Sequence, residues 1–67
     1  MTPADIRAHI LKRLKDGPLT TASLGYSLPL ANGYDRAYRQ VLRLKADGLI
    51  EAAGKDLGGT LWRLAQP

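Results

Sequence analysis

Three arginines stand at positions where their side chains could act together on one ligand. Arg36, Arg39 and Arg43 follow an i, i+3, i+7 spacing, which places them on one side of a helix because each helical residue advances about 100°. Gln40 lies beside them, and no acidic side chain falls within this stripe. Unpaired guanidinium groups repel one another, so the arrangement costs stability unless an anion meets it. Arginine can pair with guanine edges and glutamine with adenine edges, so a nucleic acid is one such anion.

The stripe has two interpretations, a solvated basic face on an ordinary helix or a contact surface for a polyanion. The formal net charge of +4 favours the polyanion. Further candidates are polar or cationic residues that the predicted elements place near the stripe or within reach of a phosphate. They are Lys55 at a predicted hairpin tip, Arg63 facing away from the predicted core, Thr21 at the start of the second helix, and Asn32 and Tyr34 at the start of the third.

Other kinds of chemistry are poorly supported by the composition. The 67 residues include one histidine and no cysteine, which excludes thiolate zinc sites and a cysteine nucleophile. The acidic residues form no pair at the spacing of a metal or acid–base site. We therefore expect no enzymatic activity, no cofactor, no metal and no small-molecule effector. No apolar run approaches the length of about 18 residues that spans a bilayer, and the first residues do not resemble a secretory signal, so a cytoplasmic, nucleoid-associated protein is expected.

Helix signals define the first half of the chain. The first helix is predicted over residues 3–16, with Thr2 as N-cap, Pro3 at the first helical position and Asp5 near the positive end of the dipole. The glycine and proline at positions 17 and 18 should end it. The second helix is predicted over 21–28, where Gly25 would let another helix approach closely. The inward-facing residues of these two helices are Ile6, Ile10, Leu14, Leu24 and Leu28.

The arginine stripe belongs to a third predicted helix, over residues 33–47. Asn32 should cap it, with Asp35 completing a capping box. Its apolar face should contain Tyr34, Ala37, Tyr38, Val41 and Leu44. The remaining residues alternate as two strands over 49–53 and 60–64, joined by a glycine-rich turn over 54–59. We expect Tyr38 and Trp62 in the core, Trp62 and Leu64 anchoring the hairpin on the helices, and His9 on the surface.

The order of these elements resembles a winged helix-turn-helix domain over nearly the whole chain. The resemblance is carried by ILKRLKDGPLTTASL, by AYRQVLRLKADGLIEA and by the closing TLWRL. In particular, Val41, Leu44 and the run Gly48-Leu49-Ile50 resemble the end of a recognition helix entering the first wing strand in bacterial regulators of the MarR, ArsR and related kinds. The expected fold is mostly α with a small β-hairpin, as one domain over residues 1–67. The turn over 30–33 is about two residues longer than the usual connection.

The resemblance implies a small, sequence-specific protein that binds double-stranded DNA as a transcriptional regulator. The third helix would be the recognition helix, with Arg36, Arg39, Gln40 and Arg43 facing the major groove, and Lys55 would lie at the wing tip on the phosphate backbone. A homodimer is expected because a lone module covers one half-site. A protein-interaction module with the same core is the alternative; Leu57 and Leu61 would then be the apolar anchors of an interface. RNA remains a further possible ligand.

Overall fold

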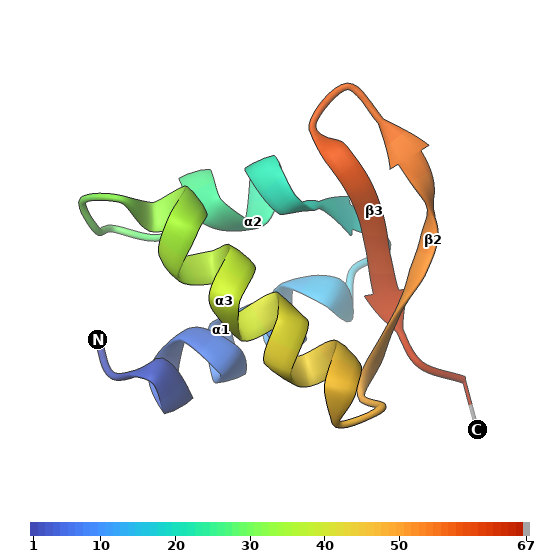
Figure 1. Cartoon of the computed structure of the whole chain (residues 1–67), viewed down its shortest axis with the longest axis horizontal. Coiled ribbons are helices and arrows are strands. Elements are labelled where there is room, and N and C mark those ends of the chain that lie inside the picture. Colours follow the sequence, from blue (N-terminus) through green and yellow to red (C-terminus); the bar gives the residue numbers. More distant parts are fainter. Residues whose placement is uncertain (67) are drawn as a thin grey trace.

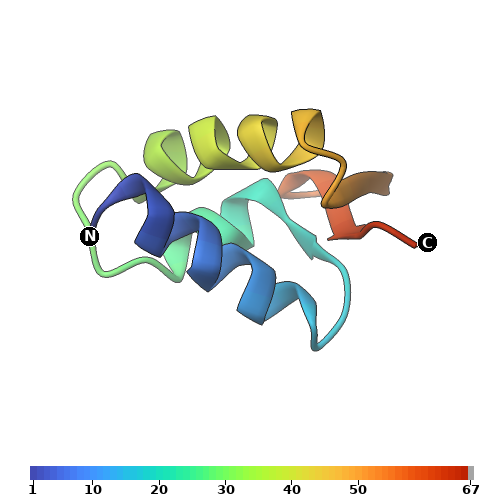
Figure 2. The ribbon, with the colours of Figure 1, turned by 90° about the horizontal axis from the view of Figure 1, so that it is seen from below.

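A computed structural model describes residues 1–66 and shows three helices packed against a small antiparallel sheet (Figure 1). The chain runs through α1 (Pro3–Leu14), β1 (Leu19–Thr20), α2 (Thr21–Tyr26), α3 (Gly33–Ala46), β2 (Ile50–Asp56) and β3 (Gly59–Leu64). Seen from below, α1 and α3 form two layers and the β2–β3 hairpin lies at the end of the molecule far from the N-terminus (Figure 2). The three predicted helices and the predicted hairpin are therefore present.

The sheet has one strand more than the predicted hairpin. Its order is β1-β3-β2, so β3 lies in the centre and pairs on both edges. Leu19 pairs with Trp62 and Thr20 with Leu61. Alternation of apolar and polar residues cannot reveal a strand of two residues, and β1 forms because the centre of β3 offers it an edge.

The turn of the hairpin is shorter than predicted. Residues 54–56 were expected in the loop, but Gly54 pairs with Leu61 and Lys55 with Thr60, which leaves positions 57 and 58 as the turn. Ala53 has no residue opposite it, because the register shifts between Ala52 and Gly54. Gly54, which follows the unpaired residue, has φ 132°, a conformation that glycine adopts without steric cost. The predicted role of Gly54 as a turn residue is therefore wrong, because it lies at the bulge within β2.

One apolar cluster holds the helices on the sheet. Its most completely buried large side chains are Ile10, Leu24, Val41 and Leu44, contributed by all three helices. Trp62 joins them from β3, and its indole Nε1 donates a hydrogen bond of 2.9 Å to the Thr21 hydroxyl. The core position predicted for Trp62 is confirmed, whereas that predicted for Tyr38 is wrong, because its side chain is 44% exposed. The complete cluster consists of Ile6, Ile10, Leu14, Leu24, Leu28, Ala37, Val41, Leu44, Ile50 and Trp62.

The predicted N-cap of α1 forms through side-chain hydrogen bonds, whereas that of α3 does not. Thr2 and Asp5 form a reciprocal capping box, since the Asp5 amide donates to the Thr2 hydroxyl and the Thr2 amide to the Asp5 carboxylate. These bonds lower the pKa of Asp5, the backbone bond from Thr2 most strongly. Asn32 stands at the N-cap of α3, but its side chain makes no cap hydrogen bond; its backbone is left-handed at φ 57° instead. The predicted capping box of α3 is therefore wrong.

The two other helices end earlier than predicted, α1 at Leu14 and α2 at Tyr26. His9, expected simply on the surface, is partly buried and lies 2.8 Å from the Ser27 hydroxyl. This contact joins α1 to the residue that follows α2.

The contact between α2 and α3 depends on glycine. A Cβ on Gly25 would lie 2.6 Å from the Cα of Tyr34, and one on Gly33 would lie 2.5 Å from the carbonyl oxygen of Gly25. Both neighbours are backbone atoms, which cannot rotate away. The close approach predicted at Gly25 is therefore confirmed. It fixes how α3 leaves the turn and so where its exposed side chains lie.

Candidate nucleic-acid interface

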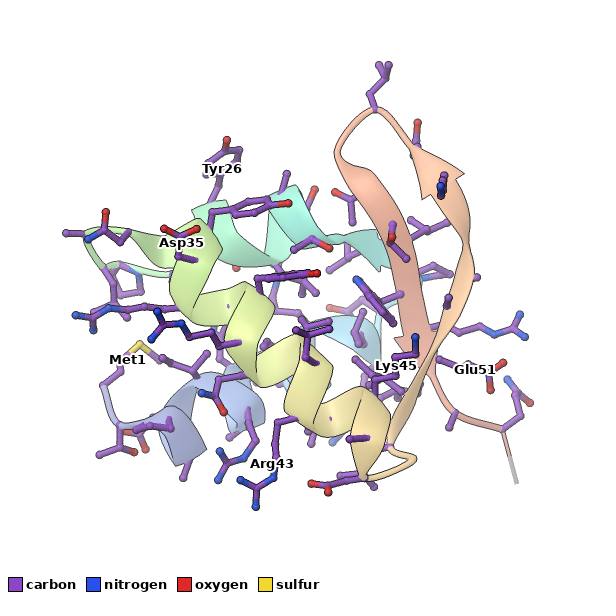
Figure 3. The ribbon with its side chains drawn as sticks, viewed as in Figure 1. Met1, Tyr26, Asp35, Arg43, Lys45 and Glu51 are labelled. Atoms are coloured by element: carbon purple, nitrogen blue, oxygen red, sulfur yellow. The ribbon has the colours of Figure 1, made fainter. Side chains whose placement is uncertain are left out.

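Helix α3 presents its candidate residues because one of its faces is held in the core. Ala37, Val41 and Leu44 are buried at i, i+4, i+7. Counting about 100° per residue from that face, Arg39 lies opposite the core. Arg36 and Arg43 lie on one flank, and Tyr38 and Lys45 lie on the other. Figure 3 shows the two flanks through Arg43, which points away from the hairpin, and Lys45, which points toward it.

The three arginines of the stripe differ in their partners. Arg43 Nε lies 3.3 Å from the Asp47 carboxylate, in an exposed i, i+4 pair. Arg36 and Arg39 are exposed and form no ion pair with any carboxylate of residues 1–66. An exposed pair of this kind contributes about 0–1 kcal/mol, so Arg43 can exchange its partner readily. The stripe therefore holds two free guanidinium groups and one weakly engaged group.

Arg36 and Arg39 border an open groove between α3 and the start of α1. The groove has a volume of about 270 Å³. Met1, Pro3 and Ile6 contribute from the α1 side. Both arginines are exposed in the first half of α3, whereas the hairpin packs beside the last turns of that helix (Figures 1 and 2).

Gln40 faces the same groove and is not free to pair with a base. Its Oε1 accepts a hydrogen bond of 2.8 Å from Arg7 Nη1 of α1. Because this oxygen is engaged, Gln40 presents mainly the N–H groups of its amide, and the adenine pairing expected from the sequence would require it to release Arg7. A contact across 33 positions of the chain leaves no local sequence signal.

The other flank of α3 is aromatic and cationic. The Tyr34 and Tyr38 rings stack with centroids 6.4 Å apart and planes inclined by 16°. Lys45 Nζ lies 5.7 Å from the centre of the Trp62 ring, which joins α3 to β3. Lys45 was not among the predicted site residues. Its spacing of seven from Tyr38 is the signal that places both on this flank.

The hairpin contributes one free cation rather than two. Lys55 is exposed in β2, two residues before the turn rather than at its tip, and forms no ion pair within residues 1–66. Arg63 is engaged, because its Nη2 and Nε lie 2.7 and 3.2 Å from Glu51 Oε2 on the paired strand. The Arg63 bonds and the backbone N–H of Gln66 hold the pKa of Glu51 below its ordinary value. Arg63 thus forms a cross-strand ion pair with Glu51 and, unlike Lys55, is not a free cation.

Thr21 does not reach the surface, which corrects the phosphate contact expected for it. Its side chain is 2% exposed and accepts the bond from Trp62. The start of α2 is also occupied, since the Ser23 amide donates to the Thr20 hydroxyl and the Ala22 amide to the Gly58 carbonyl. Asn32 and Tyr34, in contrast, are exposed at the start of α3. Arg36, Arg39 and Gln40 therefore line one groove with Arg43 on the same side of α3, whereas Lys55 and Arg63 belong to the hairpin and Thr21 is buried.

Comparisons with protein-family models, with curated proteins and with solved structures find no match for this chain. No helix in residues 1–66 has the length and apolar character required to cross a membrane. In the same part of the chain, no group of three or more histidine, cysteine, aspartate or glutamate side chains is arranged to hold a metal ion.

Proposed function

We propose that this protein is a winged helix-turn-helix module that binds double-stranded DNA in a sequence-dependent manner and acts as a transcriptional regulator. The observation that carries the proposal is the pair of exposed guanidinium groups of Arg36 and Arg39, which have no carboxylate partner within residues 1–66. Free arginines on a helix whose opposite face is anchored in the core can meet phosphates without any change of fold. The net charge of +4 adds a long-range attraction to a polyanion.

The element order supports the same proposal. A short helix and a longer helix in close backbone contact are followed by a two-stranded hairpin. In a winged helix-turn-helix domain this hairpin is the wing and α3 is the recognition helix. The connection from α2 to α3 spans residues 27–32, so α3 begins farther from α2 along the chain than in a tight helix-turn-helix.

The two flanks of α3 suggest how it would fit the DNA. A helix with its side chains is about 10–12 Å across, and the major groove is about 12 Å wide. With α3 in the major groove of the DNA, Arg39, on the side of the helix opposite the core, would meet base edges. Arg36 and Arg43 on one flank and Lys45 on the other would meet the two phosphate strands that border the groove. Lys55 would add a phosphate contact from the hairpin.

A homodimer belongs to the proposal, because one module of this size covers a single half-site. Two copies on a palindromic site would place their α3 helices one helical turn of DNA apart, about 34–36 Å. Sedimentation of the protein with a duplex carrying two half-sites gives the stoichiometry, and a 1:1 complex at saturation would contradict the dimer.

Salt dependence tests the DNA contact directly. On a duplex with a single half-site, the four phosphate contacts of one copy predict a slope of about −3 to −4 for the logarithm of the binding constant against the logarithm of salt concentration. Fluorescence anisotropy of a labelled duplex between about 50 and 200 mM salt measures it. Arg36→Ala should reduce the slope by about 1 for every sequence, and Arg39→Ala should lower the preference for the selected site over a random duplex.

Arg13→Ala is the matched control, because Arg13 is an exposed arginine in the last turn of α1 and lies outside all of these contacts. It should leave the slope and the preference unchanged. A flat salt dependence, or equal effects of Arg13→Ala and Arg36→Ala, would overturn the proposed interface.

A further inference from the structure

The groove between α1 and α3 combines an apolar wall with a cationic rim. Met1, Pro3 and Ile6 form the wall, and Arg36 and Arg39 stand on the α3 side. The Met1 side chain, labelled in Figure 3, reaches from the start of α1 toward the first half of α3. The volume of about 270 Å³ suits one large apolar side chain with its neighbours, and is smaller than most cofactor sites.

The polar groups at this groove are predominantly hydrogen-bond donors. Arg36 and Arg39 carry only N–H groups. Gln40 has its oxygen engaged by Arg7, so the amide N–H groups remain available. None of the lining residues is acidic. A ligand must therefore bring acceptors and negative charge, and carboxylates match the planar guanidinium fork in two-bond geometry.

The apolar wall distinguishes between two kinds of anion. A phosphodiester backbone offers acceptors but no aliphatic group to set against the methionine, proline and isoleucine. An acidic peptide that carries a leucine-like side chain between carboxylates satisfies both halves of the groove. Methionine adapts its shape to such a side chain at little cost.

We propose that this groove binds an acidic peptide segment of a partner protein, with one aliphatic side chain against Met1, Pro3 and Ile6 and flanking carboxylates on Arg36 and Arg39. Peptide binding depends only on the groove. A second consequence rests on the proposed DNA-binding function: since both ligands use Arg36 and Arg39, the peptide and the duplex exclude each other. An acidic partner would thereby release the protein from DNA.

Two synthetic peptides of equal length and charge test the groove on the full chain. The first alternates pairs of glutamates with single leucines, and the second has each leucine replaced by glycine. We expect the leucine peptide to bind at least about tenfold more tightly in anisotropy titrations, and to shift the NMR signals of the Met1 and Ile6 methyl groups. Equal binding of the two peptides, or shifts confined to the hairpin, would overturn the proposal.

Variants within the stripe separate the groove from the DNA interface. Arg36→Ala should weaken the leucine peptide about tenfold. Arg43→Ala should change that affinity by less than about twofold, because Arg43 does not line the groove. Both variants should weaken duplex binding. If the peptide binds with this pattern and the duplex does not bind, the peptide proposal is supported and the DNA-binding proposal is wrong.

Two further outcomes would assign the groove to another occupant and overturn the peptide proposal. In the first, the duplex shifts the Met1 and Ile6 methyl signals while the leucine peptide does not, which would give the groove to DNA. In the second, the protein alone sediments as a dimer that Arg36→Ala dissociates, and the peptide does not bind. That result would give the groove to a second copy of this chain.

Discussion

The arginines that follow the α2–α3 turn differ in their neighbours, and the difference determines what each can do. Arg63 is held by Glu51 through two short contacts, and Arg43 makes a single longer contact with Asp47. Arg36 and Arg39 have no such partner within residues 1–66. Because an exposed pair contributes little, a phosphate or a carboxylate can capture Arg43 at small cost. Of these arginines, those that lack a carboxylate partner within residues 1–66 or have a weak one therefore lie on the stripe, whereas Arg63 is engaged within the hairpin.

At the scale of single residues, the Glu51–Arg63 pair predicts a pH-dependent stability. The pKa of Glu51 is lowered in the folded chain, so its stabilising effect is complete above the ordinary glutamate pKa of about 4.3 and is lost as the pH falls through the lower folded value. Glu51→Gln should therefore lower Tm near pH 7, and the difference from the original chain should shrink at about pH 3.

Thermal unfolding followed by circular dichroism at both pH values measures this difference. Arg63→Gln retains the Glu51 carboxylate and the hydrogen bond that it accepts from the backbone N–H of Gln66. Its difference in Tm from the original chain should therefore depend less on pH than that of Glu51→Gln. A Tm difference that persists undiminished at low pH would show that Glu51 acts through packing rather than through its charge.

At the scale of elements, the contact between α2 and α3 is governed by the backbone. Gly25 lies inside a short helix, where glycine costs about 1 kcal/mol relative to alanine. This cost is offset by the close approach of Tyr34, whose backbone would collide with any Cβ at Gly25. The turn of the hairpin is placed similarly, since the Gly58 carbonyl accepts a bond from Ala22 at the start of α2. Backbone contacts of α2 thus position both α3 and the hairpin.

The Gly25→Ala substitution distinguishes these two effects. Helix propensity alone predicts a gain of about 1 kcal/mol, whereas the steric conflict predicts a net loss of about 1–3 kcal/mol. We expect the loss, measured as a lower midpoint of urea unfolding. Ala22→Gly, in the same helix, removes a methyl group without creating a collision and serves as the comparison for propensity. A more stable Gly25→Ala variant would mean that α2 and α3 can separate without cost.

At the scale of the whole molecule, stability depends on a small core. A chain of 67 residues buries a modest apolar area, and a single core of this size supplies about 3–5 kcal/mol. The core draws side chains from all three helices and from β2 and β3, so that no element has an independent interior. Loss of one large side chain should therefore unfold the entire domain.

Leu24 and Leu57 provide a matched test of this dependence. Leu24 is fully buried and Leu57 is fully exposed at the hairpin turn. Leu24→Ala should cost about 2–5 kcal/mol, comparable with the whole stability, and should leave much of the chain unfolded at 25 °C. Leu57→Ala should change the free energy of unfolding by less than about 0.5 kcal/mol. Similar losses in the two variants would place Leu57 in a self-associated interface instead.

The three helices, the hairpin, the N-cap at Thr2 and the close contact at Gly25 could all be predicted from residue types and spacing. These features depend on residues within a turn or two of one another, or on the absence of a side chain, so local periodicity and residue type are sufficient. The i, i+3, i+7 spacing likewise placed Arg36, Arg39 and Arg43 on one side of the predicted helix, and all three are exposed on α3.

What covers each face of a helix or strand depends on how the elements pack. The sequence pattern predicted both Tyr38 and Trp62 in the core. In the structure α3 turns its Ala37 side inward, which leaves Tyr38 partly exposed. Three contacts join residues more than 30 positions apart in the chain. They are the Trp62 bond to the buried Thr21, the Arg7 bond to Gln40, and the pairing of β1 with β3. Such contacts arise only when the elements pack together, because the relative placement of two faces depends on every side chain between them.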